Sequence, residues 1–238
     1  MSIMIHGKNP CKEILTTEKP VMRAFLEKGA NSDLIPLLKK KGIEIITLEK
    51  NDFNGRFQGT HQGIALEIAD YKLLSLEEAL KKHQDRTNPV FLMLDGITDP
   101  HNLGAIIRSA EAGGVSAIIY PKNRSVGVTG TVAKVASGSL EYMDLVEVTN
   151  LTQTVEKLKK QGFWIVGTDM DGTKNYSDID VSTPLCVIIG GEGKGISRLL
   201  KETADFLVRI PMVGHVNSLN ASVSAGIVIF EILRKKGF

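Results

Sequence analysis

The pattern that most limits the fold of this chain begins at residue 90, where short apolar segments alternate with stretches of helical periodicity. The apolar segments, rich in Val, Ile and Leu, are 90–94, 117–120, 145–148, 164–168, 185–189 and 207–210. The helical stretches are 103–112, 131–136, 151–161, 197–202 and 221–236. Continuously apolar strands that alternate with helices form a parallel sheet covered on both faces. Such sheets bind ligands at the carboxyl ends of their strands, so the loops there should carry the function.

The N-terminal part of the chain, 1–70, predicts a separate, smaller α/β unit. Strand-like segments at 21–26, 43–48 and 63–69 accompany a helix expected from Ser32 to Lys41. Ser is a helix-capping residue, and the lysines at 39–41 suit a helix C-terminus. Residues 71–89 are charged and poor in apolar side chains, apart from a short helix that begins at Ser75. They are predicted to be a linker, and the second domain is predicted at 90–238.

The bulk properties describe an ordinary soluble protein. A chain of 238 residues is long enough for two such domains and needs no disulfide or metal for stability. Cys11 and Cys186 are far apart, which favours reduced thiols in a cytoplasmic protein. No signal peptide is evident, no segment reaches the ~18 apolar residues of a membrane span, and the scattered histidines predict no metal site. A net charge of +2 permits a nucleic-acid partner without demanding one.

Two residues draw attention to the loop after the strand at 90–94. Asn102 lies at the mouth of the helix predicted over 103–112, and Arg108 lies inside that helix. A charged side chain flanked by Ala and Ile costs free energy unless it has a polar or anionic partner. That partner is either Glu111, on the next turn of the helix, or a ligand.

Glycines dominate the loop after the strand at 185–189, which reads Ile189-Gly-Gly-Glu-Gly-Lys-Gly. Four glycines around Glu192 let the backbone approach a ligand closely and adopt positive φ angles. The loop lacks the Gly-Lys-Ser/Thr ending of a phosphate-binding P-loop. Glu192 therefore either caps the next helix or serves a ligand of another kind.

Small polar residues crowd the third loop, which leads into the helix over 221–236. They are Asn217, Ser218, Asn220, Ser222 and Ser224. One Asn or Ser is enough to cap a helix, and Ala221 stands where a capping box from Ser218 would need Glu or Gln. The surplus predicts a neutral, hydrogen-bonding pocket for a polar ligand. For Ser222, Ser224 and Gly226 we expect close helix packing instead.

Together, the three loops resemble the signature motifs of the SpoU group of RNA ribose 2′-O-methyltransferases, within the SPOUT superfamily. The matching segments are Asp99-Pro-His-Asn-Leu-Gly-Ala-Ile-Ile-Arg-Ser-Ala, Ile189-Gly-Gly-Glu-Gly-Lys-Gly and Ile210-Pro-Met-Val-Gly-His-Val-Asn-Ser-Leu-Asn-Ala-Ser. Their order and spacing match the family pattern. The N-terminal unit at 1–70, including His61-Gln-Gly-Ile-Ala, resembles the ribosomal-protein-like RNA-binding domain of the bacterial 23S rRNA guanosine-2′-O-methyltransferases.

The resemblance implies a fold and a site that composition and spacing alone do not. The fold is an α/β domain with a parallel sheet and a deep trefoil knot, preceded by a smaller α/β RNA-binding domain. The cofactor is S-adenosylmethionine. The residues implied to hold the cofactor are Thr168, Gly190, Gly191, Ile210, Met212 and Leu219. The residues implied to act in catalysis are Asn102, Arg108, Glu192, Ser218 and Asn220.

The implied activity is methylation of a ribose 2′-hydroxyl in RNA by a homodimer, with a guanosine of 23S rRNA as the expected site. Arg108 is either the general base, which is demanding because arginine keeps its proton, or the residue that grips a neighbouring phosphate. Glu192 would orient Arg108 or the substrate. The alternatives are the same reaction on tRNA or another rRNA site, a small-molecule methyltransferase, and a non-catalytic RNA-binding protein of ribosome assembly. The N-terminal lysines and Arg23 would neutralise RNA phosphates.

Overall fold

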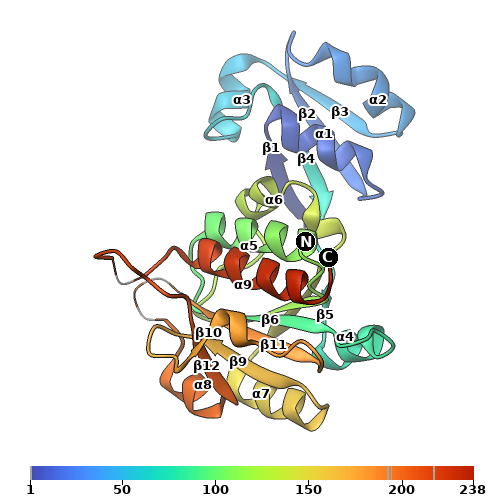
Figure 1. The fold of residues 1–238 in the computed structure, drawn as a ribbon. Coiled ribbons are helices and arrows are strands. Elements are labelled where there is room, and N and C mark those ends of the chain that lie inside the picture. The colour runs from blue at the N-terminus through green and yellow to red at the C-terminus, as the bar shows by residue number, and fades with distance from the viewer. Residues whose placement is uncertain (1, 192, 194, 217) are drawn as a thin grey trace. The chain divides into compact units, whose positions relative to one another are not determined.

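The computed structural model describes residues 2–191, 193, 195–216 and 218–238 (Figure 1). Contacts between residues divide the chain into two compact units. Unit 1 comprises the chain up to Tyr71 together with Val128–Glu141. Unit 2 comprises Lys72–Gly127 and Tyr142–Phe238. The chain therefore leaves unit 2 once, to contribute a short segment to unit 1.

Unit 1 is built on a four-stranded sheet. Its strands are β1 (Ser2–His6), β2 (Val21–Glu27), β3 (Glu44–Leu48) and β4 (Ile64–Ala69), in the order β1-β4-β2-β3. β4 is antiparallel to β1 and β2, whereas β2 and β3 are parallel. The helices of the unit are α1 (Lys8–Thr16), α2 (Ile35–Lys40), α3 (Lys50–Arg56) and α6 (Gly130–Ala136), and α6 packs against β1. The strands predicted at 21–26, 43–48 and 63–69 are confirmed.

The helix predicted from Ser32 to Lys41 begins later than expected. Ser32–Leu34 form a single 3₁₀ turn, and α2 starts at Ile35 with Pro36 in its first turn. The N-cap of α2 is Leu34, with no side-chain cap bond, so the expectation that Ser32 caps the helix is wrong. Proline suits the first turn because its missing N–H would have no partner inside the helix.

Unit 2 contains an eight-stranded sheet in which every neighbouring pair is parallel. The strand order is β10-β12-β9-β11-β6-β7-β8-β5. The strands are β5 (Leu73–Leu74), β6 (Val90–Asp95), β7 (Ala117–Pro121), β8 (Asp144–Val148), β9 (Trp164–Thr168), β10 (Lys174–Asn175), β11 (Leu185–Gly190) and β12 (Phe206–Arg209). The predicted parallel α/β sheet is confirmed.

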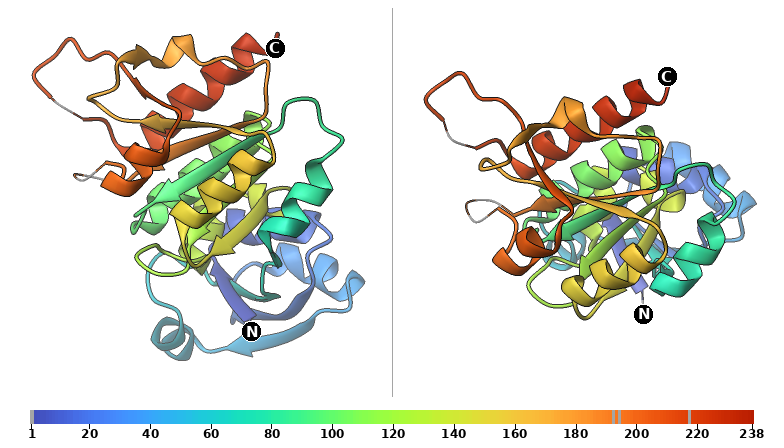
Figure 2. Two further views of the ribbon diagram at one scale, coloured as in Figure 1. Left: turned by 90° about the horizontal axis from the view of Figure 1, so that it is seen from below. Right: turned by 60° about the horizontal axis from the view of Figure 1, so that its bottom comes forward.

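Helices cover both faces of this sheet (Figures 1 and 2). α5 (Pro100–Ala112) and α9 (Ala221–Lys235) lie side by side on one face. The opposite face carries α4 (Leu76–His83), α7 (Leu151–Lys160) and α8 (Arg198–Thr203). Alternate strand residues, such as Phe91 and Met93, pack into the core beneath that second group. Because strand side chains alternate between faces, the intervening Leu92, also fully buried, points toward α5 and α9.

The segment predicted as a linker, 71–89, has structure of its own beyond the short helix that was expected. It holds β5 and α4, and Leu76 is buried in the core of unit 2. Ser75 and Glu78 form a capping box at the start of α4. At its end, the His83 ring lies 2.8 Å from Asp144 on β8. These contacts explain why residues 72–89 belong to unit 2.

Close packing of α5 on α9 aligns the starts of the two helices. A Cβ at Gly113, just after α5, would lie 2.1 Å from the Cγ2 of Ile229 in α9. A Cβ at Gly226 would lie 3.9 Å from the Ser109 hydroxyl, which is an ordinary van der Waals distance, so the helix contact there does not require glycine. With the helix bodies held together in this way, Asn102 of α5 and Asn220 before α9 come within hydrogen-bond distance.

Candidate active site

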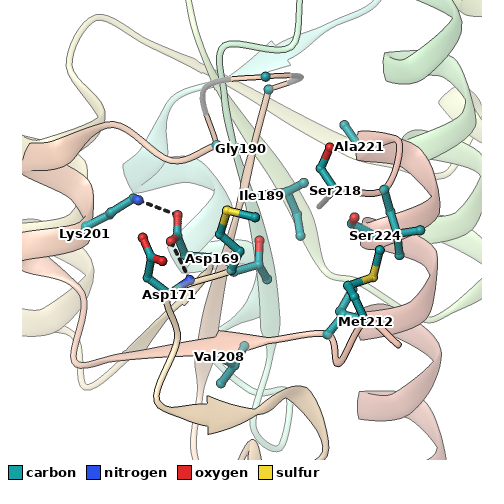
Figure 3. Close-up of a pocket in the computed structure, with 17 residues that line it drawn as sticks. Asp169, Asp171, Ile189, Gly190, Lys201, Val208, Met212, Ser218, Ala221 and Ser224 are labelled. Atoms are coloured by element: carbon teal, nitrogen blue, oxygen red, sulfur yellow. Dashed lines mark hydrogen bonds and ion pairs between the residues drawn. The ribbon is translucent and has the colours of Figure 1, made fainter. Parts of the chain in front are cut away.

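A cavity of about 340 Å³ lies at the carboxyl ends of β9, β11 and β12 in unit 2 (Figure 3). This is the edge where a parallel sheet is expected to bind its ligand. The residues that line the cavity are Thr168, Asp169, Met170, Asp171, Ile189, Gly190, Gly191, Gly193, Gly195, Lys201, Val208, Ile210, Met212, Ser218, Leu219, Ala221 and Ser224. All six residues predicted to hold the cofactor are among them. The structure therefore brings together positions from three separate segments, from Thr168 at the end of β9 to Leu219 just before α9.

Two glycines form the wall where the backbone approaches most closely. Gly190 is the last residue of β11, and a Cβ there would lie 2.1 Å from the carbonyl carbon of Gly195. A Cβ at Gly191 would lie 2.3 Å from the carbonyl oxygen of Gly96. Only glycine fits at either position without moving backbone atoms.

The same loop is tied to the neighbouring strand by Asp95 at the end of β6. The Asp95 carboxylate accepts a hydrogen bond of 2.7 Å from the Ser197 backbone N–H, and its carbonyl accepts one of 2.8 Å from Gly191. Asp95 therefore fixes both ends of the glycine loop. Nothing in the sequence singled it out, because an acidic residue at a strand end has many other uses.

A charged group that the sequence reading missed lies on one side of the cavity. The Lys201 ammonium contacts the Asp169 carboxylate at 2.6 Å, and the other oxygen of that carboxylate accepts the Asp171 backbone N–H at 3.1 Å. The Asp169 side chain is 4% exposed. Figure 3 shows these groups across the cavity from Ser218 and Ser224. The neutral pocket expected from the Asn and Ser cluster is thus neutral on one side only.

We expect Lys201→Met to lower the free energy of unfolding by about 2 kcal/mol, because it leaves the buried Asp169 carboxylate without its cation. The matched control is Lys159→Met. Lys159 is equally exposed (30%) but pairs at 2.9 Å with Asp205, whose side chain is 26% exposed. That loss should stay below about 1 kcal/mol. Urea unfolding measures both, and equal losses would contradict the distinction.

Asn102 and Asn220 join the starts of α5 and α9. The Asn220 Nδ2 donates a hydrogen bond of 2.9 Å to the Oδ1 of Asn102, which is 6% exposed. The Asn220 Oδ1 accepts from the backbone N–H groups of Ser222 and Val223, so Asn220 is the N-cap of α9. Asn220 is not among the described residues that line the cavity, to which this loop contributes Ser218 and Ser224 as small polar residues. Asn220 therefore has two structural functions, the cap of α9 and the link to α5.

Substitutions at Asn220 can separate these two functions. Serine caps helices nearly as well as asparagine but is too short to reach Asn102, whereas alanine does neither. We expect Asn220→Ser to lose about 1 kcal/mol of unfolding free energy, for the hydrogen bond, and Asn220→Ala about 2 kcal/mol. If urea unfolding gives equal losses for Asn220→Ser and Asn220→Ala, the cap contributes nothing to the stability.

Arg108 and Glu111 do not form the pair that a purely structural explanation required. Arg108 is exposed on α5, and within the part of the chain that the structure describes no carboxylate forms an ion pair with its guanidinium. The free-energy cost inferred from its apolar neighbours in sequence was wrong, because its side chain faces solvent. Glu192 and Asn217 lie outside the described residues. Ser224 lines the cavity, which corrects the expectation that it serves only helix packing.

The described residues 2–191, 193, 195–216 and 218–238 contain no group of three or more His, Cys, Asp or Glu side chains placed to hold a metal ion. Over the same residues, no helix has the length and apolar character required to cross a lipid bilayer.

A parallel sheet with a glycine-walled cavity at its carboxyl edge is the arrangement with which α/β proteins bind small molecules. The model of the SpoU rRNA Methylase family matches residues 89–230. A second model, described as RNA 2′-O ribose methyltransferase substrate binding, matches residues 4–74. The chain belongs to the SpoU rRNA Methylase family. It is a methyltransferase, as the three loop motifs predicted.

Relatives match the chain over nearly its whole length. A protein of Staphylococcus saprophyticus, named as a TrmH family tRNA/rRNA methyltransferase, is 42% identical over 99% of this chain and 97% of its own. The protein YacO of Bacillus subtilis carries the same family name and is 40% identical over 97% of this chain and 94% of its own. The chain therefore spans nearly the full length of these relatives.

Solved structures share the fold. The SpoU methyltransferase AviRb from Streptomyces viridochromogenes, in complex with AdoMet, has a TM-score of 0.82 at 23% identity, over 99% of this chain and 90% of its own. An AdoMet-bound rRNA methyltransferase from Sinorhizobium meliloti has a TM-score of 0.78 at 23% identity, over 98% of this chain and 87% of its own. AdoMet is S-adenosylmethionine, the cofactor that the sequence predicts and that this family uses.

The residues around the cavity fit S-adenosylmethionine by size and chemistry. A volume of about 340 Å³ suits a compact, folded ligand, since small-molecule pockets span roughly 300–1,000 Å³. The backbone cradle at Gly190 and Gly191 would be filled by any Cβ. Ile189, Ile210 and Leu219 offer apolar contact for a purine ring, and the acidic side of the cavity suits cationic groups.

Proposed function

We propose that the protein transfers a methyl group from S-adenosylmethionine to a ribose 2′-hydroxyl of RNA, and that its substrate is a guanosine of 23S rRNA in the cytoplasm. The observation that carries this proposal is the cavity itself. It unites the six predicted cofactor residues with Ser218, and it adjoins α9, whose N-cap Asn220 bonds Asn102. Membership of the SpoU rRNA Methylase family and the match of residues 4–74 to a substrate-binding domain support RNA as the acceptor.

Cofactor binding is assigned to the walls of the cavity. Backbone groups at Gly190, Gly191 and Ile210 hold the adenosine, while Met212 and Leu219 cover it. The Thr168 hydroxyl already donates to the Ile188 carbonyl at 2.9 Å, so it can serve only as an acceptor. Two carboxylates, Asp169 and Asp171, against one ammonium, Lys201, leave that side with one negative charge, which suits a cofactor of net positive charge. A trefoil knot in the chain around this cavity is part of the proposal.

Arg108 is assigned to the RNA. When bound, S-adenosylmethionine would supply a methyl group on a sulfonium centre, whose carbon would bond to the ribose oxygen as the sulfur leaves in line as a neutral thioether. The exposed Arg108 is free to grip the phosphate beside the target ribose with two parallel N–H groups. It then lies where negative charge develops on the attacking oxygen. Orientation of this kind can lower the barrier by roughly 7–11 kcal/mol.

The proton of the 2′-hydroxyl leaves through phosphate or water, because arginine does not act readily as a base. Ser218, which lines the cavity, is assigned to hold the ribose. The hydrogen bond between Asn102 and Asn220 is assigned to hold the starts of α5 and α9 together. Glu192 is assigned to orient Arg108 or the substrate.

The active protein is proposed to be a homodimer. On α9, Val223 and Phe230 are each 48% exposed and lie two helical turns apart, so they share one face of the helix. An exposed apolar face of this kind is suited to a second subunit. Light scattering during gel filtration should give twice the chain mass of 25.9 kDa, and a monomer that retains full activity would contradict the dimer.

A substrate panel tests the proposal. Labelled S-adenosylmethionine is incubated with unmodified 23S rRNA, unmodified 16S rRNA and tRNA, each with the wild-type protein and with Arg108→Ala. We expect label in 23S rRNA alone, at one guanosine, and none with the variant. Label in tRNA alone would keep the chemistry and contradict the substrate. Tight cofactor binding without transfer to any RNA, including an assembly precursor, would favour a non-catalytic RNA-binding protein.

A further inference from the structure

A second cavity, of about 490 Å³, lies wholly within unit 1, away from the cofactor residues in the chain. It is lined by Met4, His6, Arg56, Phe57, Gln58, Thr129, Gly130 and Thr131. Two distant parts of the sequence therefore build it: the N-terminal segment up to Gln58, and the short segment around α6 that unit 1 receives from residues 128–141. Nothing in the sequence motifs or in the role of the cofactor cavity accounts for this pocket.

The junction between the two segments is close and specific. A Cβ at Gly130 would lie 2.1 Å from the Met4 carbonyl oxygen, so the start of α6 rests directly on the backbone of β1 (Figure 1). Thr129 caps α6 by accepting the Val132 backbone N–H at 3.3 Å. This contact fixes the rim of the pocket that carries Thr131, which is exposed.

The positively charged side chain of Arg56 lies at the pocket and is held in place by aromatic rings. Its guanidinium lies over the Phe25 ring at 4.3 Å and within 5.8 Å of the Phe57 ring centroid. Contact with aromatic rings restrains the group without using its N–H donors. Across the described residues, no ion pair or hydrogen bond of the Arg56 side chain is found. A restrained guanidinium with free donors is the group that binds phosphate best.

The remaining groups at the pocket carry no negative charge that would repel a phosphate. None of the eight lining residues is acidic. The Nδ1 of His6 is buried and has no hydrogen-bond partner in the described part of the chain. Burial, with a smaller contribution from the positive charge of Lys134, lowers the pKa of His6, so its ring is neutral at neutral pH. Gln58 and Thr131 add an amide and a hydroxyl, the groups that recognise a ribose hydroxyl or a base edge.

We propose that this pocket binds one nucleotide of the RNA substrate, with its phosphate on Arg56 and its sugar or base on Gln58 and Thr131. The proposal rests on the RNA methyltransferase function above and adds a specific contact outside the methyl-transfer site. The volume suits a single nucleotide, since ligand pockets begin at roughly 300 Å³. The residues around Thr131 then take part in choosing the RNA, although they lie beyond the segment that matches the substrate-binding domain.

The test uses two charge-changing variants of the full chain, each with a matched control. Arg56→Gln removes the proposed phosphate contact, and Lys160→Gln removes one exposed positive charge at the end of α7, outside unit 1. Thr131→Glu places a carboxylate in the pocket, and Thr131→Gln has the same size without the charge. The probe is whichever unmodified transcript, 23S rRNA or tRNA, the wild-type protein methylates, and its Kd is measured by fluorescence anisotropy.

We expect Arg56→Gln and Thr131→Glu each to raise the RNA Kd about tenfold or more, and both controls to raise it less than about threefold. Affinity for S-adenosylmethionine and the midpoint of thermal unfolding should not change for Thr131→Glu. If Arg56→Gln and Thr131→Glu bind RNA as tightly as their controls while the wild type still methylates it, the nucleotide pocket is wrong and the proposed function stands. A wild-type protein that binds S-adenosylmethionine but neither binds nor methylates RNA would instead overturn the proposed function.

Discussion

Arg108→Ala is expected to reduce the rate of methyl transfer by about 100-fold or more, because it removes the charge that meets the phosphate and the developing oxyanion. The loss should appear in kcat at saturating RNA. Folding should be unaffected, since Arg108 is exposed and forms no ion pair with a described carboxylate. Single-turnover transfer of labelled methyl, together with urea unfolding, measures both effects.

Arg108→Lys is the control for this variant. Lysine keeps the charge but cannot make two parallel hydrogen bonds to one phosphate. We expect it to recover only part of the rate. Full activity of Arg108→Lys at neutral pH would contradict a bidentate contact between Arg108 and the phosphate. Full activity of Arg108→Ala would show that Arg108 has no role in methyl transfer.

Gly190→Ala is expected to have the second large effect, because its Cβ would lie 2.1 Å from the Gly195 carbonyl carbon and 2.4 Å from the Ile196 backbone nitrogen. These are backbone atoms, so the loop must move as a whole. We expect S-adenosylmethionine affinity, measured by calorimetry, to fall at least about tenfold, and the free energy of unfolding to fall by about 3 kcal/mol.

The matched control is Gly214→Ala, in the loop between β12 and α9. A Cβ at Gly214 has no neighbour within 4 Å, and the backbone there has no positive φ. Its stability should stay within about 0.5 kcal/mol of the wild type. A Gly190→Ala protein that binds the cofactor as well as Gly214→Ala would exclude Gly190 from the cofactor wall.

Hydrophobic pattern was sufficient to predict the central strands of unit 2. Its central strands are buried on both faces, so each appears in the sequence as a continuous apolar run bounded by turn residues. Strands β6, β9 and β11 begin at the residues that the pattern indicated. β5 (Leu73–Leu74) and β10 (Lys174–Asn175) are too short to leave such a pattern.

Unit 1 was predicted less well because its helices bury little. α3 buries only Phe53, and the remainder of its sequence is polar. α1 buries Cys11, Ile14 and Leu15, but Pro10 near its start hides the helical periodicity. The assignment of α6 to unit 1 depends on a close approach between Gly130 and Met4, which are so distant in the sequence that no local pattern records it.

In the site, motif resemblance predicted residues that local physics could not. The six positions predicted to hold the cofactor come from three separated loops, and only the motifs indicated that they meet at one cavity. Conversely, the motifs did not include Asp169 and Lys201, whose ion pair forms part of the same cavity. A buried aspartate can be recognised in a sequence only when its cationic partner is known. The partner here, Lys201 of α8, is separated from Asp169 along the chain by β10 and β11, so no local pattern links them.

The most direct test of the central claim is to locate the transferred methyl group on the RNA. RNA labelled from S-adenosylmethionine by the wild-type protein is hydrolysed completely with alkali and the products are separated. Alkaline cleavage needs a free 2′-hydroxyl, so a ribose-methylated nucleotide stays joined to its 3′ neighbour. The account predicts that the label appears in dinucleotides. Label in mononucleotides would show methylation of a base and would contradict the proposed chemistry.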